Sequence, residues 1–383
     1  LAGGSITVSS VAGGTDTLVS IERAKIGGAN YLIVPGTNAA NSGAGAVIGG
    51  SEAELLLGFN NADELRGNGG DDILVGGAGT DQMFGGAGND IYWVQQAADV
   101  VTEAGGEGID TIYTNVNRNL TVASQVVGEV ENVVLVGATG TEALNAVGNA
   151  LNNELIGNAG NNTLTGNAGN DTLIGNAGND TLNGGANDDI LNGGAGDDTL
   201  NGGAGTDRAV FAGRVGDYAF GLNAAGLATV THLATGDVDT LSGIERIQFG
   251  DGPVLDVVTT VAGIPAGPAI LFGTSGADTI VGGPGADVII GGTGDDTLNG
   301  SDIGDGDDTV TPGSADDDTF IWYVCDGSDT INGGLEGANG DLFQIIGNAE
   351  AETYRIYTYD EAVARIGFAG SDEAEIIVTR QTE

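Results

Sequence analysis

The sequence predicts an all-β fold in which parallel β-roll blocks, a form of β-solenoid, are separated by short β-rich spacer modules. Two observations predict it. Residues 148–210 form seven consecutive nine-residue repeats in one frame with Gly always at position 1, and 72 of the 383 residues are Gly. Each repeat has six turn-forming residues followed by a three-residue strand with one apolar side chain, such as Leu173. A tandem period of this length is typical of stacked coils.

The acidic residues follow the same frame, because position 6 of each repeat is Asp or Asn. Two repeats make one coil, so repeat i is expected to stack on repeat i+2 at the strand spacing of about 4.8 Å. Stacked carboxylates repel unless a cation lies between them. Oxygen ligands, flexible geometry and several turn carbonyls favour Ca²⁺ over Mg²⁺ or Zn²⁺, so the rolls are predicted to be calcium-loaded. The candidate ligands of this block are Asn153, Asn162, Asp171, Asp180, Asp189, Asp198 and Asp207.

Residues 1–48 are predicted to be a partial β spacer module. GTDTLVSIERAKI at 14–26 parallels DVDTLSGIERIQF at 237–249, but the strand-like stretch before the second copy, 214–223, has no counterpart before the first. The chain is therefore interpreted as a piece of a longer polypeptide or as a processed product.

Residues 49–94 are predicted to form β-roll block 1, and residues 95–147 a β-rich connector with strands at 99–104, 110–116 and 130–137. Block 1 has repeats in the same frame and ends in an aromatic strand. Its candidate ligands at position 6 are Asp63, Asp72, Asp81 and Asp90.

Block 2 spans residues 148–210, and a β spacer module is predicted at 211–272. Residues 273–345 are predicted to form block 3, which loses its register at 300–311 and is degenerate at its end. Its candidate ligands are Asp278, Asp287, Asp296 and Asp308. Residues 346–383 are predicted to be a truncated mixed segment with a short helix at 360–368.

Five segments carry a family resemblance: GGAGND at 85–90, GNAGND at 166–171 and 175–180, GGAGDD at 193–198 and GGTGDD at 291–296. They resemble the G-G-x-G-x-D-x-U-x repeat of the repeats-in-toxin (RTX) family, a motif that is specific when it occurs in tandem. The resemblance implies a calcium-bound parallel β-roll and export by a type I secretion apparatus from a Gram-negative cell.

The pairs expected to share an ion are those two repeats apart. Asn153/Asp171 and Asn162/Asp180 are expected to be weaker, since each has one charge fewer, and turn carbonyls should complete every site. The alternative is that these Asp side chains only form Asx-turns. The stronger pairs are Asp63/Asp81, Asp72/Asp90, Asp171/Asp189, Asp180/Asp198, Asp189/Asp207 and Asp278/Asp296.

Charge excludes several partners. The chain has 54 Asp and Glu against 10 Lys and Arg, a net charge of −44. A surface this acidic repels nucleic acid and anionic membranes. No apolar run is long enough for a transmembrane helix, so direct membrane insertion is not expected. A solvated surface or disorder is the alternative explanation of such acidity, but here the acids follow the repeat frame.

Catalytic signals are weak, and no catalytic residue is predicted. His232 is the only histidine and is expected to be a half-exposed strand residue, and the lone Cys325 a buried one. The aromatic residues after the blocks, such as Tyr92 and Trp93, are expected to plug the roll ends rather than to form sugar platforms.

The function predicted is that of a non-enzymatic extracellular structural protein, a segment of a surface layer, matrix or adhesin. It would fold and self-associate, or join other surface components, on binding roughly ten Ca²⁺ ions, a number taken from the stacked repeats. The alternative is the carrier region of a secreted protease, lipase, epimerase or peroxidase whose catalytic domain lies outside this chain. A pore-forming toxin would need an apolar helical region, which this sequence lacks.

Overall fold

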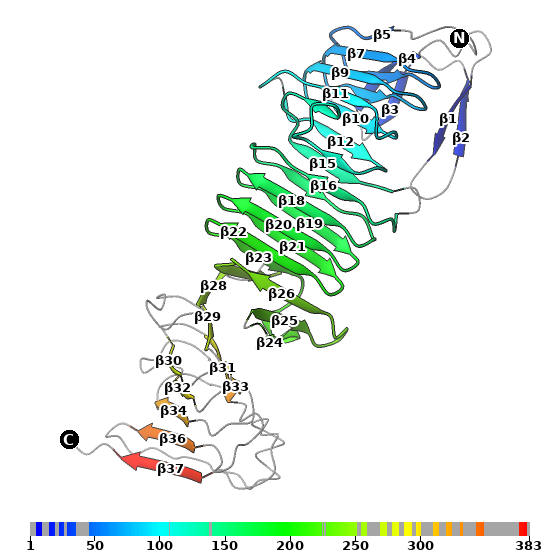
Figure 1. Ribbon diagram of the computed structural model, residues 1–383. Helices are drawn as coiled ribbons and strands as arrows, with labels where there is room; N and C mark the ends of the chain where they lie inside the picture. The colour runs from blue at the N-terminus through cyan, green and yellow to red at the C-terminus, as the bar shows by residue number, and fades with distance from the viewer. Residues whose placement is uncertain are drawn as a thin grey trace. The chain divides into compact units, whose positions relative to one another are not determined.

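The computed structural model consists of short β-strands joined by turns (Figure 1). It divides into two compact parts, Leu1–Asp189 and Ile190–Glu383, here called the N-terminal and C-terminal parts. The structure describes residues 5–9, 15–19, 23–26, 29–35, 46–106, 108–137, 140–223, 225, 227–250, 254–258, 269–273, 278–282, 287–292, 296–299, 309–313, 319–323, 330–331, 342–347 and 375–380. Among these residues the helical structure is one 3₁₀ turn, η1 (Val215–Asp217), and no helix has the length and hydropathy to span a membrane.

In the N-terminal part, alternate repeats supply the strands of one parallel ladder. Its members are β4 (Ala29–Pro35), β6 (Glu54–Leu57), β8 (Ile73–Val75), β10 (Ile91–Val94), β12 (Thr111–Thr114), β15 (Asn132–Leu135), β17 (Glu154–Ile156) and β19 (Thr172–Ala177). Near the start of the chain, β1 (Ser5–Ser9) pairs antiparallel with β2 (Thr15–Val19). Strand β3 (Arg23–Ile26) pairs antiparallel with β4.

The intervening repeats supply two further parallel ladders. The first comprises β5 (Ala46–Ile48), β7 (Glu64–Gly69), β9 (Gln82–Ala87), β11 (Val100–Thr102) and β14 (Val126–Val127). The second comprises β13 (Arg118–Asn119), β16 (Asn145–Val147), β18 (Thr163–Ala168) and β20 (Thr181–Ala186).

Burial alternates along the block 2 strands β18, β19 and β20 with the two-residue period of a pleated sheet. In β19, Leu173 at position 8 is fully buried, whereas Thr172 and Ile174 are half-buried. The turn residue at position 2 adopts a left-handed backbone, with a φ of 82° at Asn167 and 120° at Gly185. Asn and Gly tolerate this conformation better than other residues, which explains their alternation at position 2.

Strand register confirms that repeat i stacks on repeat i+2. Leu155 pairs with Leu173, and Leu164 pairs with Leu182. The parallel β-roll predicted from the sequence is therefore the fold of this chain, and its core is the inward row of position-8 side chains.

The residues between blocks 1 and 2 continue the same coils. The predicted strands of the connector are present as β11, β12 and β15, and β12 pairs with β10 of the first block. Position-8 pairing continues from Tyr92 to Ile112, Val133 and Leu155. Coil length rises here from 18 residues to 20, 21 and 22, so these coils lack the nine-residue signature yet keep the register.

The C-terminal part begins with the same stacking and then inserts a hairpin. Strand β21 (Ile190–Ala195) pairs in parallel with β23 (Arg208–Phe211), and β23 with β27 (Arg246–Phe249). Strand β22 (Thr199–Ala204) pairs in parallel with β26 (Val238–Ser242). Between them, β24 (Tyr218–Leu222) and β25 (Ala228–His232) form an antiparallel hairpin whose second strand also pairs with β26.

The described residues after β27 form two further ladders of the C-terminal part. In the first, β28 (Val254–Val258) is antiparallel to β27, and parallel pairing then joins β29 (Ala269–Phe272), β31 (Val288–Gly292), β33 (Thr309–Gly313) and β35 (Thr330–Ile331). The second contains β30 (Thr279–Val281), β32 (Thr297–Asn299), β34 (Thr319–Tyr323), β36 (Leu342–Gly347) and β37 (Glu375–Arg380). The helix predicted at 360–368 and the lone Cys325 lie outside the described residues.

Candidate metal centre

A repeated hydrogen bond joins the position-6 residues of stacked repeats. The backbone N–H of Asp72 donates to Oδ1 of Asp90 at 2.7 Å, and that of Asp171 donates to Oδ1 of Asp189 at 2.8 Å. The structure thus brings predicted partners together in columns within each part. The same bond links Glu54/Asp72, Asp63/Asp81, Asn153/Asp171, Asn162/Asp180 and Asp278/Asp296.

The second carboxylate oxygen points toward the Gly at position 1. Oδ2 of Asp72, Asp81 and Asp171 is buried and accepts no hydrogen bond. A Cβ on Gly67 would overlap with Oδ2 of Asp72 and would lie 2.6 Å from the carbonyl oxygen of Gly85. The missing side chain therefore leaves a small space lined by carboxylate and carbonyl oxygens.

These residues fit Ca²⁺. A buried carboxylate oxygen without a partner is costly, and carboxylate and carbonyl oxygens are the ligands that Ca²⁺ prefers. The position-6 Asp side chains and the position-1 carbonyls would hold the ion, whose positive charge would neutralise the column. The Asx-turn alternative leaves Oδ2 of Asp72, Asp81 and Asp171 unexplained.

Burial makes the carboxyl groups of Asp72, Asp81, Asp171 and Asp180 weaker acids than usual. Burial raises the pKa of Asp72 to about 8. The hydrogen bond from the Glu54 backbone N–H lowers this pKa, and the charges of Asp90 and Glu54 raise it by smaller amounts. Burial likewise raises the pKa of Asp81, Asp171 and Asp180 to about 6. A divalent cation favours the charged form, so calcium bound in these columns would displace protons.

The two Asn-bearing repeats differ from this pattern. Asn153 Nδ2 donates to the carbonyl of Glu131 at 2.8 Å, and its Oδ1 accepts from the N–H of Asn149 at 2.7 Å. Asn162 Nδ2 donates to the carbonyl of Leu144 at 2.9 Å. Protein groups thus satisfy both side-chain amides, in agreement with the expectation that these positions bind calcium weakly.

Sequence analysis missed position-6 residues that lie outside the repeat blocks. Asp99, Asp110 and Glu131 continue the columns of block 1 through the connector, with hydrogen bonds of 3.0, 2.8 and 2.8 Å from Asp81, Asp90 and Asp110. Asp99 still fits the frame, 18 residues after Asp81, but Asp110 and Glu131 fall outside it because their coils lengthen to 20 and 21 residues. The available signal was an acid directly before each predicted strand, as in DTIYTNV at 110–116.

The C-terminal part extends its columns in the same way. The Asp198 N–H donates to Oδ1 of Asp239 at 2.9 Å, and the Asp207 N–H donates to Oε2 of Glu245 at 2.8 Å. The spacer module therefore supplies two acids that the repeat pattern does not mark. In the predicted pairs Asp180/Asp198 and Asp189/Asp207, the first residue belongs to the N-terminal part and the second to the C-terminal part. These two pairs therefore stay predictions.

The ligand candidates of block 3 are placed only in part. Asp287 is buried and accepts the N–H of Ala269 at 2.8 Å, and Asp296 is buried beside Asp278. Asp308 lies outside the described residues.

Other sequence expectations have mixed outcomes. His232 is half-exposed at the end of β25, as predicted, with Nδ1 3.0 Å from Oγ1 of Thr235. Tyr92 is fully buried, as predicted, but it does not plug a roll end, because β10 pairs with β12 of the next coil. The same expectation for Trp93 is wrong, because strand alternation turns Trp93 outward, where it stacks on Tyr113 at 5.2 Å between ring centroids.

The match of the sequence to a family of calcium-binding repeats agrees with the geometry. The sequence contains four copies of the RTX calcium-binding nonapeptide repeat, at residues 57–92, 147–182, 174–209 and 272–302. A search of curated proteins gives no match. Among solved structures, the chain is similar to the extracellular lipase LipA of Serratia marcescens, with 14% identity and a TM-score of 0.20 over 71% of this chain and 60% of that chain. The chain thus spans about three fifths of the length of that lipase. From the matched repeats and the coiled fold, this chain contains a calcium-binding RTX region.

Proposed function

We propose that this chain is a non-enzymatic structural segment of an extracellular protein, of the surface-layer, matrix or adhesin kind. The observation that carries the proposal is the continuity of the coils. In the N-terminal part the acidic columns pass from block 1 through the connector by way of Asp110 and Glu131. The connector between blocks 1 and 2 is therefore not a flexible linker but a set of coils in the same stack. A continuous stack suits a protein that forms part of a surface layer or matrix.

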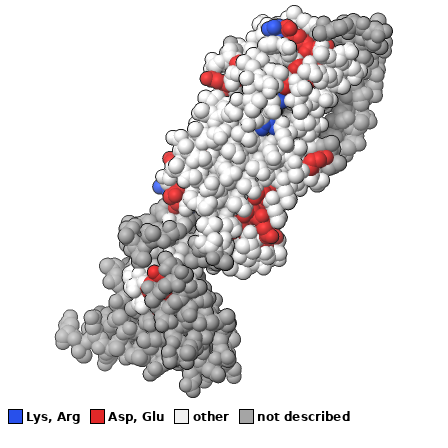
Figure 2. Space-filling model, viewed as in Figure 1, with Lys and Arg blue, Asp and Glu red and all other residues white. Residues whose placement is uncertain are grey.

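Burial of the acids supports assembly. The sequence alone predicts a strongly acidic surface, but the position-6 Asp side chains of block 1 and of the N-terminal part of block 2 are buried. On the face shown in Figure 2 the described surface is mostly uncharged, with Asp and Glu in scattered patches. Bound calcium would neutralise the buried acids, so repulsion between copies is weaker than the net charge of −44 suggests.

The proposed setting is outside the cell. Extracellular calcium modules work at roughly 10⁻⁴–10⁻³ M Ca²⁺, far above cytosolic levels. In the cytosol the chain would remain unfolded and competent for type I export. Outside, it would take up roughly ten ions, a number estimated from the stacked repeats. Its partners would be further copies of itself or other surface components.

A calcium titration followed by light scattering and circular dichroism tests the proposal. We expect β-structure to appear first and the scattering mass to rise at higher calcium, with ordered assemblies visible by electron microscopy. A chain that folds but stays monomeric at every calcium concentration would defeat the structural role and favour the carrier region of a secreted enzyme.

A further inference from the structure

Where block 1 meets the connector, a Glu takes the place of a repeat glycine. Thr102 in β11 pairs with Phe84 in β9, so the next residues, Glu103 and Gly85, lie side by side. One coil earlier, the neighbour of Gly67 at this position is Gly85. Glu103 is nevertheless buried, with 4% of its surface exposed. Its side chain therefore enters the interior that position 1 normally leaves open.

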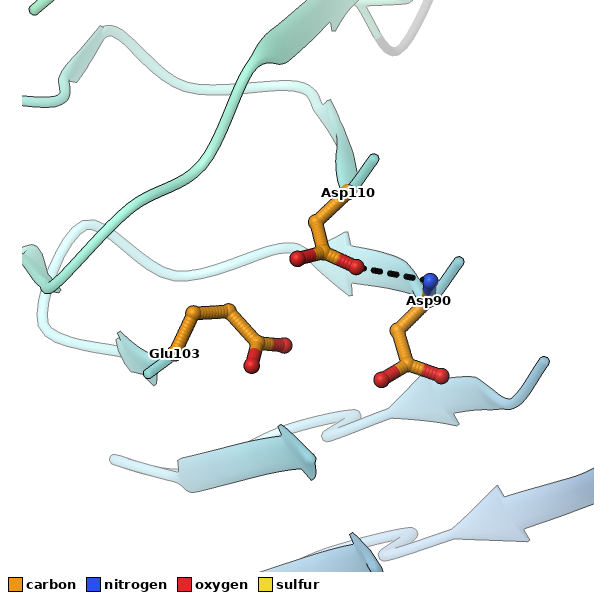
Figure 3. A group of neighbouring side chains, drawn as sticks. All are labelled: Asp90, Glu103 and Asp110. Atoms are coloured by element: carbon orange, nitrogen blue, oxygen red, sulfur yellow. Dashed lines mark hydrogen bonds between the residues drawn. The ribbon is translucent and has the colours of Figure 1, made fainter. Parts of the chain in front are cut away.

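Four oxygen-bearing side chains converge there. Asp90, Glu103 and Asp110 each offer a carboxylate oxygen, and these oxygens lie within 4.8 Å of one another. Figure 3 shows the three side chains turned toward a common centre, with the Asp90 N–H donating to Asp110. A Cβ on Gly85 would overlap at once with Asp90 Oδ2, the Tyr92 hydroxyl and Glu103 Oε1.

The Tyr92 hydroxyl provides an independent indication of a ligand. Tyr92 is fully buried, and its hydroxyl oxygen has no hydrogen-bond partner. Buried Tyr hydroxyls usually have a partner, because an unpaired one loses its hydration without compensation. The hydroxyl is directed at the same small space as the carboxylates, where a cation would give it a partner.

We propose that Asp90, Glu103, Asp110 and the Tyr92 hydroxyl form a calcium site that differs from the repeat sites in its ligands. Three carboxylates so close together repel one another unless a cation offsets their charge. Two features distinguish the site: a Glu side chain replaces a repeat glycine, and a phenol oxygen contributes. An all-oxygen set of irregular geometry selects Ca²⁺ over Mg²⁺, which demands an octahedron.

The site would fasten the first connector coil to block 1. Asp90 belongs to the last repeat of the block, whereas Glu103 and Asp110 flank the turn between β11 and β12. The repeat frame ends between these residues, and one ion would hold both sides. This inference does not depend on whether the chain assembles.

The test compares Glu103→Gln with wild type in the full chain. The amide keeps the shape of the side chain but removes its charge. We expect calorimetric titration with Ca²⁺ to show one bound ion fewer, or one site weakened by about tenfold or more, since even indirect ligand partners have effects of this size. Glu129→Gln, an exposed acid of the same connector, is the matched control and should titrate like wild type.

Terbium gives a local readout of the same site. Tb³⁺ replaces Ca²⁺ and emits when a nearby excited Tyr or Trp transfers energy to it. With Tyr92 in place, Glu103→Gln should lose part of this emission, and Glu129→Gln should not. Equal stoichiometry and equal emission in wild type and Glu103→Gln would overturn the proposal.

Tyr92→Phe decides the matter if Glu103→Gln fails to regain β-structure in calcium. The change removes a single oxygen, and Tyr113→Phe on the half-exposed Tyr is its control. Weaker binding of one ion in Tyr92→Phe alone supports the site, whereas identical calcium titrations of the two variants would contradict it.

Discussion

The Asn-bearing repeats at the start of block 2 and the Asp-bearing repeat that follows share one coil geometry but differ in a single side-chain atom. Oδ1 of Asn153 faces Gly148 as Oδ2 of Asp171 faces Gly166, but Oδ1 of Asn153 accepts the N–H of Asn149. The Asn153 donor finds the carbonyl of Glu131, whereas Oδ2 of Asp171 accepts no hydrogen bond. The Asn repeats are thus closed by protein groups, and the Asp repeat needs a cation.

The connector differs from the repeats in a second way, because it places a buried arginine beside a column acid. Arg118 is buried, and its Nη2 donates to the carbonyls of Asp99 and Gln125 at 3.1 and 2.7 Å. Burial lowers the pKa of Arg118 to about 10, and the charge of Asp99 opposes this shift. The guanidinium lies close enough to Asp99 for their charges to offset each other, as calcium would offset the acids of the repeats.

The largest effect should follow removal of calcium. In chelator the Asp columns keep their mutual repulsion, and the thin core of one apolar side chain per repeat cannot offset the ordering cost. We expect circular dichroism to show a largely disordered chain that gains β-structure steeply in millimolar Ca²⁺. An equal β-signal in chelator and in calcium would refute the need for the ion.

The next largest effect should come from lowering the pH in chelator, because protons can partly take the place of calcium in stabilising the folded chain. The folded-state pKa values of about 8 for Asp72 and about 6 for Asp81 and Asp171 lie above the ordinary value of 3.8. The folded state therefore binds more protons than the unfolded state between these values, so its stability falls as the pH rises from 3.8 to about 6 for Asp81 and Asp171, and to about 8 for Asp72. In chelator, lowering the pH from about 8 to 5 should raise the β-signal toward its calcium-bound value.

The same shifts give the opposite trend in calcium. Protons compete with the ion for the carboxylates, so the calcium midpoint should move to higher concentration as the pH falls from about 8 to 6. A midpoint independent of pH would show that the raised pKa values do not belong to the ligands.

How far the sequence predicts this architecture depends on where the nine-residue frame holds. Gly at position 1 and Asp at position 6 predict the coil, the register and the columns, because each has one local role. The frame is silent where coils lengthen: Asp110 and Glu131 occupy the same columns after 20 and 21 residues. Glu103 is hidden for a different reason, since only the pairing of β9 with β11 shows that it replaces a glycine.

A single-site comparison sharpens the contrast between Asp and Asn. Asp171→Ala removes a ligand and the acceptor of the Asn153 N–H, and it leaves Asp189 without a charged neighbour two repeats earlier. Asn162→Ala removes only amide hydrogen bonds, which should cost about 1 kcal/mol. Calorimetric titration should show fewer bound ions in Asp171→Ala and an unchanged number in Asn162→Ala. Equal losses would contradict the assignment of Asn162 as a protein-satisfied position.

The smallest effect is expected from adding a charge where the coil is already closed. Asn162→Asp replaces the Nδ2 donor with an oxygen that faces the carbonyl of Leu144. In chelator this oxygen meets another acceptor, so the variant should be destabilised by about 1–3 kcal/mol. In calcium the new carboxylate at position 162 pairs with Asp180. Two stacked carboxylates can then share an ion, as is predicted for Asp171 and Asp189. The net stability in calcium should therefore stay close to wild type, and the variant should gain one weak ion. A variant equally destabilised with and without calcium would show that position 6 of this repeat cannot accept the ion, and that more than one atom separates the Asn repeats from the Asp repeats.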